Sequence, residues 1–323
     1  MRDPVQQTAA FTCLVCGSAD GRPATRRAEL ELQLASCERC GFVQQHPVPD
    51  EADVAAMYAE QASFCDDLER GAEIFLERDR RVLAELAARG ARGPLLDVGA
   101  GAGILLRAAV ERGWEAIGIE PSRPSREHIQ KRVAATLYDV DLDDAPIEPG
   151  SIGVVTLSHS LEHVRDPVAT MRRVLEVLRP GGMVFVAVPN WAAGTRVVLD
   201  GQISWVASCH ISYFDRASLE RTFRAAGLEP VAFETQPFLG VNYALAIDFA
   251  RKLRLERPAQ RFLRMGDHPL AQLIGDDLQL PCPPWRLRVV MKAAHALLRM
   301  WPEGLCVRMG RGQELRGVAR RAV

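Results

Sequence analysis

Four cysteines near the N-terminus are grouped in a way that suits metal binding. Cys13-Leu-Val-Cys16-Gly17 and Cys37-Glu-Arg-Cys40-Gly41 are two CxxCG motifs, separated by a polar stretch long enough for a hairpin. Four thiolates complete the tetrahedral coordination of a structural Zn²⁺, and the glycine after each pair permits a tight turn at the metal. We therefore expect these four cysteines to bind one zinc ion that has no open position for catalysis. A redox pair and a set of unrelated thiols are the alternative interpretations.

A second group of residues suits a nucleotide-like cofactor. The segment Leu95-Leu-Asp97-Val-Gly99-Ala-Gly101-Ala-Gly103 has the pattern of a buried strand that runs directly into a helix. Its three alternating glycines let the backbone turn sharply and approach a ligand closely, while its carboxylate can bind a cationic group. A dinucleotide fingerprint has the spacing GxGxxG, whereas this loop has GxGxG, which disfavours an NAD enzyme. The predicted cofactor-binding residues are Asp97, Gly99, Gly101, Gly103 and, at the end of the next strand, Glu120, whose carboxylate would meet ribose hydroxyls.

Three histidines are candidates for a general base, the group that would remove a proton from a substrate. His159 and His163 follow a predicted strand, and His210 lies in a segment placed to cover the same crevice. Imidazole titrates near neutral pH, so each of them could act as a general base. For His163 the alternative is a cap or a hydrogen bond to the backbone. Tyr58 is expected to cover the cofactor as part of a lid.

These candidates need a scaffold, and the hydrophobic pattern predicts one. Strand-like apolar runs alternate with helical stretches, which is typical of parallel βαβ units. The expected strands are Leu95–Val98, Glu115–Ile119, Ala135–Tyr138, Ile152–Leu157, Met183–Val188, Leu228–Thr235 and Glu314–Ala319. The expected helices are Asp50–Met57, Glu69–Ala88, Ile104–Arg112, Ser125–Val133, Pro167–Leu178 and Arg216–Ala226. The acceptor is then expected outside the carboxyl ends of the strands, where open α/β sheets bind ligands.

Charge and hydropathy limit the kinds of partner. The chain has 40 Lys and Arg against 41 Asp and Glu, so no global field attracts nucleic acid or an anionic membrane. There is no secretory signal core and no apolar run of about 18 residues that could span a bilayer, so we expect a cytoplasmic protein. The stretch between Arg251 and Arg264 is locally basic, and we interpret it as a solvent-exposed surface. The alternative interpretations are a binding site for an anionic acceptor and a peripheral contact with a membrane.

From Gly93 to Asn190 the sequence resembles the class I S-adenosylmethionine-dependent methyltransferases. The likeness is carried by the glycine loop, by Leu161-Glu162-His163, and by the turn Leu178-Arg-Pro-Gly-Gly182. The resemblance implies that Asp141 meets the adenine amino group, that Leu142 offers a backbone contact, and that Ser158 belongs to the cofactor site, with Asp139 and Asp143 as alternatives to Asp141. The cysteine module also resembles the N-terminus of sugar C-methyltransferases from polysaccharide and natural-product pathways, although this chain is too short for their extra C-terminal domain.

Together these features predict an α/β fold with a doubly wound, Rossmann-like sheet, a small N-terminal zinc ribbon and a helical C-terminal insert. The expected division is a zinc-binding ribbon over residues 1–48, a helical lead-in and lid over 49–92, an S-adenosylmethionine-binding core over 93–236, and a helical insert with a returning last strand over 237–323.

The expected function is S-adenosylmethionine-dependent methylation of oxygen, carbon or nitrogen on a small-molecule or glycan intermediate, such as a nucleotide- or lipid-linked sugar. An RNA base methyltransferase is a second hypothesis, which the near-neutral charge disfavours. A non-catalytic cofactor-binding scaffold is a third hypothesis, which the intact glycine loop and acidic positions disfavour. The expected cofactors are S-adenosylmethionine and structural Zn²⁺.

Overall fold

The structure is a computed structural model that describes residues 10–27, 32–50, 53–54, 72–194, 196, 206–236 and 303–323. Tyr58 and most of the predicted helical insert lie outside these residues. Of the short helix expected over residues 50–57, only positions 53 and 54 are described beyond its first residue, and both are helical.

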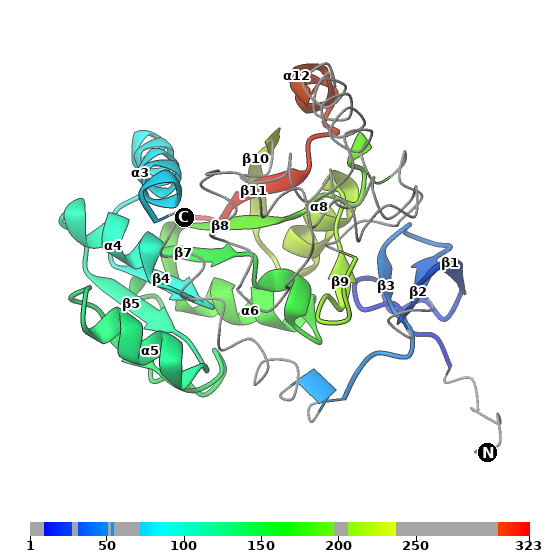
Figure 1. The fold of residues 1–323 in the computed structure, drawn as a ribbon, viewed down its shortest axis with the longest axis horizontal. Coiled ribbons are helices and arrows are strands. Elements are labelled where there is room, and N and C mark those ends of the chain that lie inside the picture. The colour runs from blue at the N-terminus through cyan, green and yellow to red at the C-terminus, as the bar shows by residue number, and fades with distance from the viewer. Residues whose placement is uncertain are drawn as a thin grey trace, which may run out of the picture.

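A seven-stranded sheet forms the centre of the molecule, with the strand order β10-β11-β8-β7-β4-β5-β6 (Figure 1). Its strands are β4 (Leu95–Val98), β5 (Ala116–Ile119), β6 (Thr136–Tyr138), β7 (Ile152–Ser158), β8 (Leu178–Pro189), β10 (Glu229–Gln236) and β11 (Glu314–Arg320). All neighbours from β6 to β8 are parallel, whereas β11 is antiparallel to both β8 and β10. The chain leaves β4 first toward β5 and later continues on the other side through β7, so the order reverses between β4 and β7.

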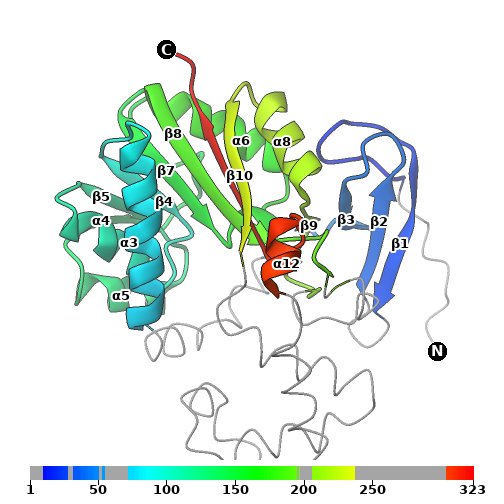
Figure 2. The ribbon, with the colours of Figure 1, turned by 90° about the horizontal axis from the view of Figure 1, so that it is seen from above.

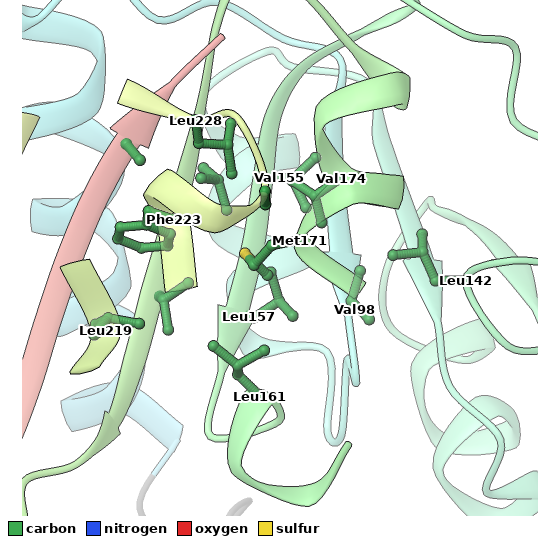
Figure 3. Packing of buried hydrophobic residues seen from close by; sticks show 14 of the residues in the cluster. Val98, Leu142, Val155, Leu157, Leu161, Met171, Val174, Leu219, Phe223 and Leu228 are labelled. Atoms are coloured by element: carbon green, nitrogen blue, oxygen red, sulfur yellow. The ribbon is translucent and has the colours of Figure 1, made fainter. Parts of the chain in front are cut away.

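Helices cover both faces of this sheet, because successive strand residues point to opposite sides. On one face lie α3 (Ala72–Ala88), α4 (Ile104–Glu111) and α5 (Arg123–Gln130), packed against a core that includes Leu95. On the other face lie α6 (Pro167–Val177) and α8 (Arg216–Ala225), whose core includes the neighbouring Leu96 (Figure 2). Figure 3 shows Met171 and Val174 from α6 and Phe223 from α8 in this second core. The predicted doubly wound α/β fold is confirmed.

A second, four-stranded sheet forms the N-terminal module. It has the order β1-β2-β3-β9, with β1 (Gly21–Arg27), β2 (Leu32–Cys37) and β3 (Val43–Gln45) from the N-terminus. Its fourth strand, β9 (Ser212–Tyr213), comes from far along the chain, after β8, and pairs antiparallel with β3. The ribbon is therefore joined to the larger domain by backbone hydrogen bonds and not only by the covalent chain.

Most of the expected boundaries lie within one residue of the observed ones, and the larger differences are in α5, which ends at Gln130 instead of Val133, and at the start of β8. The helix α5 begins at Arg123 rather than Ser125, because the Ser122 side chain accepts a hydrogen bond from the backbone N–H of Ser125 and Pro124 suits the first turn. The strand β8 begins at Leu178, since Leu178 already pairs with Ile152 of β7. Near the C-terminus, a short helix α12 (Glu303–Arg308) precedes β11. Within the described part of the chain, no helix is both long and apolar enough to cross a membrane.

Candidate active site

The glycine loop after β4 has the conformation that its sequence requires. Gly99, Gly101 and Gly103 have positive φ angles of 78°, 53° and 74°, in the left-handed region that only glycine adopts readily. A Cβ atom on Gly99 would come within 2.8 Å of Ser160, and one on Gly103 within 2.8 Å of Ile129, whereas Gly101 faces open space. The loop therefore needs glycine for backbone shape at all three positions and for packing at two of them.

Glu120 links this loop to the end of β5. One carboxylate oxygen accepts a hydrogen bond of 2.7 Å from the backbone N–H of Gly101, and the other accepts one of 2.8 Å from the N–H of Ser122. Burial raises the pKa of Glu120, although these two N–H groups oppose the rise. The carboxylate thus lies beside the glycine loop at the carboxyl edge of the sheet. Its oxygens have further lone pairs that can accept hydrogen bonds from a ligand.

Asp97 is buried at the end of β4, opposite Thr156 of β7. The Thr156 hydroxyl donates a 2.7 Å hydrogen bond to it, yet burial and the nearby carboxylates of Asp79 and Glu120 raise the pKa of Asp97 to about 7. A carboxyl group poised in this way favours a cationic ligand, because a bound positive charge would stabilise its ionised form.

The remaining predicted cofactor residues lie at the same edge of the sheet. Asp141 is exposed in the turn after β6, and the side chain of Leu142 is buried in the core (Figure 3). Ser158 is the last residue of β7 and is half-buried. Because β4, β5, β6 and β7 are parallel neighbours, all these positions follow carboxyl strand ends. Tyr58 lies outside the described residues.

His159 is held between two buried carboxylates. Its Nε2 lies 3.0 Å from Oε2 of Glu314 in β11, and its Nδ1 lies 3.5 Å from Oε1 of Glu162. Burial alone would lower the pKa of His159, but the interactions with Glu162 and Glu314 raise it to about 9. The ring is therefore a cation near neutral pH, which argues against the predicted role of His159 as a general base.

The backbone of His159 is also strained. Its φ of 56° is the one positive value among the described residues other than glycine. Left-handed conformations of side-chain-bearing residues persist where the surroundings fix them, and they cluster at functional sites. Here the two carboxylates and a 2.8 Å hydrogen bond from the His159 N–H to the Ala187 carbonyl fix the residue.

His163 and His210 come together although 47 positions separate them in the sequence. Their ring centroids are 4.7 Å apart with the planes nearly perpendicular. His163 ends the short 3₁₀ helix η2 (Leu161–His163), and its Nδ1 lies 2.7 Å from the backbone carbonyl of Cys209. A carbonyl only accepts, so Nδ1 carries the proton in this contact and the neutral ring has its lone pair on Nε2.

The segment that carries Cys209 and His210 is fixed from two sides. The N–H of Ile211 donates to the Glu162 carbonyl in η2, and the carbonyl of Ile211 accepts from the backbone N–H of Gln45 in β3, both at 2.8 Å. The buried Gln45 side chain also donates to the carbonyls of Ser208 and His210, at 2.5 and 3.0 Å. The N-terminal ribbon thus positions this part of the site directly.

The four N-terminal thiols converge at the other end of the ribbon. The Cys13 and Cys40 sulfurs are 3.5 Å apart, and those of Cys16 and Cys37 are 3.6 Å apart. These separations exceed the ~2.0 Å of a disulfide and approach the ~3.8 Å edge of a ZnS₄ tetrahedron with bonds of about 2.3 Å. Gly17 and Gly41, with φ of 70° and 76°, close the two turns. The cluster fits the donor set and the size of a structural zinc site.

The sequence does not identify several charged and polar side chains that lie near the predicted site residues. Glu314 and Arg316 come from the last strand, Arg78 and Asp79 come from α3, and Thr156 lies within β7. Arg78 contacts both Asp79 and Glu314, so the helix before the core and the last strand share one charge network. No spacing in the sequence links residues 78 and 314. Charged residues are common throughout α3 and β11, so no signal in the sequence singles out Arg78 or Glu314.

The central part of the chain is similar to known methyltransferases. A family model described as a methyltransferase domain matches residues 71–232, half of the chain. A ubiquinone biosynthesis O-methyltransferase of Idiomarina loihiensis is 31% identical over 179 residues, which are 47% of this chain and 73% of that protein. A protein of the same description from Pseudomonas paraeruginosa is 36% identical over 102 residues, 30% of this chain and 44% of that relative, so this chain spans less than half of the relative's length.

Solved structures similar to this chain have lower identity. An S-adenosylmethionine-dependent methyltransferase from Archaeoglobus fulgidus has a TM-score of 0.49 and 14% identity, with 80% of this chain and 99% of that chain covered. The fold assignment rests on the strand order and on the family match.

Proposed function

The chain belongs to the methyltransferase domain family, and from this premise we propose that it transfers the methyl group of S-adenosylmethionine to an oxygen of a small-molecule acceptor. The observation that carries the proposal is the glycine loop. Three left-handed glycines at the carboxyl end of β4 lie beside Asp97 and beside the Glu120 carboxylate that accepts from Gly101. This is the point where the strand order reverses, at which open α/β sheets bind their ligands.

Each cofactor residue then has a role that its chemistry suits. Asp97 would bind the cationic amino group, the N–H groups of the glycine loop would meet the carboxylate, and Glu120 would accept from the ribose hydroxyls. Asp141 and the Leu142 backbone would meet the adenine, with Ser158 closing the site at β7. When bound, the sulfonium supplies an already activated methyl group, so this chain's residues mainly have to orient the acceptor and handle its proton.

On the acceptor side, two histidines are suited to handling the proton. The Nδ1 of His163 contacts the Cys209 carbonyl, so the lone pair of its neutral ring is on Nε2, and the His210 ring packs edge to face against it. The curated relatives are named as O-methyltransferases of ubiquinone biosynthesis, which favours a hydroxyl group as the acceptor. We propose that His159, a cation between two carboxylates, positions this region without exchanging the acceptor's proton.

The N-terminal ribbon has a structural role in this proposal. Zn²⁺ bound by Cys13, Cys16, Cys37 and Cys40 would stabilise the ribbon. The hydrogen bonds of Gln45 would then hold the segment with Cys209 and His210 in place. With four protein ligands such a zinc ion has no position for a substrate.

Calorimetric titration with S-adenosylhomocysteine tests the proposed function, with NAD titrated in parallel. We expect micromolar binding of S-adenosylhomocysteine, loss of that binding in Asp97→Ala and Glu120→Ala, and no binding of NAD. A chain that binds neither ligand would refute the proposal and favour a scaffold role. Once binding is established, transfer to hydroxylated aromatic compounds would test the acceptor class.

A further inference from the structure

A second group of metal-ligand side chains lies in η2 and in the segment before β9. Three ligand atoms, one each from His163, Cys209 and His210, lie within 4.8 Å of one another, and all three residues are half-buried. We propose that they form a second metal site, which binds a borderline divalent ion such as Zn²⁺ and leaves one coordination position open. The proposal deepens the proposed function, on which it rests, by assigning a ligand class to its acceptor side.

The ligand types and their orientation support a metal. Two imidazole nitrogens and a thiolate are ligands that zinc prefers, and three protein ligands with a fourth position open are typical of catalytic zinc sites. Histidines that bind metals usually donate their other ring N–H to a carbonyl or carboxylate. The 2.7 Å contact of His163 Nδ1 with the Cys209 carbonyl is such an interaction, and in this tautomer Nε2 is the ring nitrogen that carries the lone pair for a metal.

The surrounding charge also favours a cation. Glu162 is 1% exposed, and neither of its carboxylate oxygens has a hydrogen bond of good geometry within the described residues. One oxygen, Oε1, is 3.5 Å from Nδ1 of His159. A divalent ion would balance the charge of a Cys209 thiolate, and its remaining positive charge would stabilise the Glu162 carboxylate together with the His159 cation.

The location connects the group to the cofactor site. His163 belongs to the same short helix whose preceding residue, Ser160, lies against Gly99 of the glycine loop. The backbone of Glu162 accepts from Ile211, so both ligand segments are tied together at this point. The ion would occupy the imidazole lone pairs that could otherwise take the proton, and it would instead lower the pKa of an acceptor hydroxyl bound at its open position.

Metal content of the full chain tests the proposal. The protein is equilibrated with Zn²⁺, freed of excess ion and analysed by mass spectrometry for zinc per chain. We expect about two ions in the wild type, one in the four-cysteine site and one here, and about one in Cys209→Ser. Cys306→Ser is the matched control, since Cys306 is a half-buried thiol in α12 outside both groups, and it should retain both ions.

Replacement of zinc by Co²⁺ gives a second readout that does not depend on stability. Co²⁺ bound by a thiolate has characteristic charge-transfer absorption, so the second equivalent should add a band that Cys209→Ser and His210→Ala lack. Equal zinc content in the wild type and Cys209→Ser, with identical cobalt spectra, would overturn the proposal. Titration with S-adenosylhomocysteine keeps the two hypotheses apart: a chain that binds the second ion but not this ligand would refute the proposed function and leave the metal site standing.

Discussion

The cofactor side and the acceptor side of the candidate site are built in different ways. The cofactor side comes from one continuous strand, loop and helix with the following strand, so Asp97, the glycine loop and Glu120 lie within 24 residues of sequence. The acceptor side combines η2, the segment before β9, the ribbon strand β3, the helix α3 and the last strand β11. The first is determined by local backbone conformation, and the second depends on long-range contacts that must all form.

Because of this difference, we expect that a mutation can disrupt the structure of the acceptor side and leave cofactor binding intact. The largest effect is expected from Cys37→Ser combined with Cys40→Ser. Structural zinc sites contribute about 10 kcal/mol or more to the folding of small zinc modules, so the ribbon should unfold and release Gln45 from the segment around His210. Hydrogen exchange should show lost protection in β2, β3 and residues 206–214.

The cofactor side should survive that change, with S-adenosylhomocysteine affinity within a few-fold of the wild type by calorimetry. Cys306→Ser serves as the control for loss of one thiol. If cofactor binding disappeared together with the ribbon, the two sides would form one cooperative unit and the comparison would be wrong.

The second largest effect is expected from His159→Ala, which removes the cation between Glu162 and Glu314. Removal of one partner from a buried ion pair costs roughly 3–5 kcal/mol, because the remaining charge has no compensation. Urea denaturation should measure this loss near neutral pH. Glu220→Gln, which breaks a surface pair with Arg224, should change the free energy of unfolding by about 0.5 kcal/mol or less.

The pH dependence of that stability has a defined sign. The folded-state pKa of His159 is raised from its ordinary 6.5 to about 9, so protonation favours the folded state. Its stabilisation is complete below about pH 6.5 and is lost as the pH rises through about 9. The wild type should therefore lose stability relative to His159→Ala between these values, and parallel curves for the two proteins would contradict the assignment.

The backbone of the glycine loop and the parallel strands could be predicted from the sequence because their signals are local. The spacing of Gly99, Gly101 and Gly103 reflects three left-handed residues, and apolar runs of four to seven residues marked the strands of the parallel sheet. The acceptor side was predicted only as separate histidines. No pattern within the chain could show that Glu314 neutralises His159, or that β9 joins the ribbon sheet, since these contacts follow from strand order across more than 150 residues.

On the cofactor side, the effect of backbone strain on stability can be separated from the effect on cofactor affinity. Gly101 and Gly113 both have positive φ, 53° and 78°, and an added Cβ would meet nothing within 4 Å at either position. Alanine at each should therefore cost about 1–2 kcal/mol of stability. Only Gly101→Ala, in the cofactor loop, should also weaken S-adenosylhomocysteine binding, by about a hundredfold, which is roughly 2.7 kcal/mol. Equal affinities for the two variants would remove Gly101 from the site.

The smallest expected effect is a pH dependence of cofactor affinity that originates at Asp97. Burial and the neighbouring carboxylates of Asp79 and Glu120 raise the pKa of Asp97 to about 7, and a bound amino cation would favour its ionised form. Affinity should then fall as the pH drops below 7, by about tenfold between pH 8 and pH 6, because each pKa unit below the midpoint removes most of the ionised carboxylate. Asp97→Asn keeps the shape without the charge, so its affinity should be lower at pH 8 and nearly independent of pH. Calorimetry at pH 6, 7 and 8 measures both proteins, and an equally steep fall in the variant would place the titrating group elsewhere on the cofactor side.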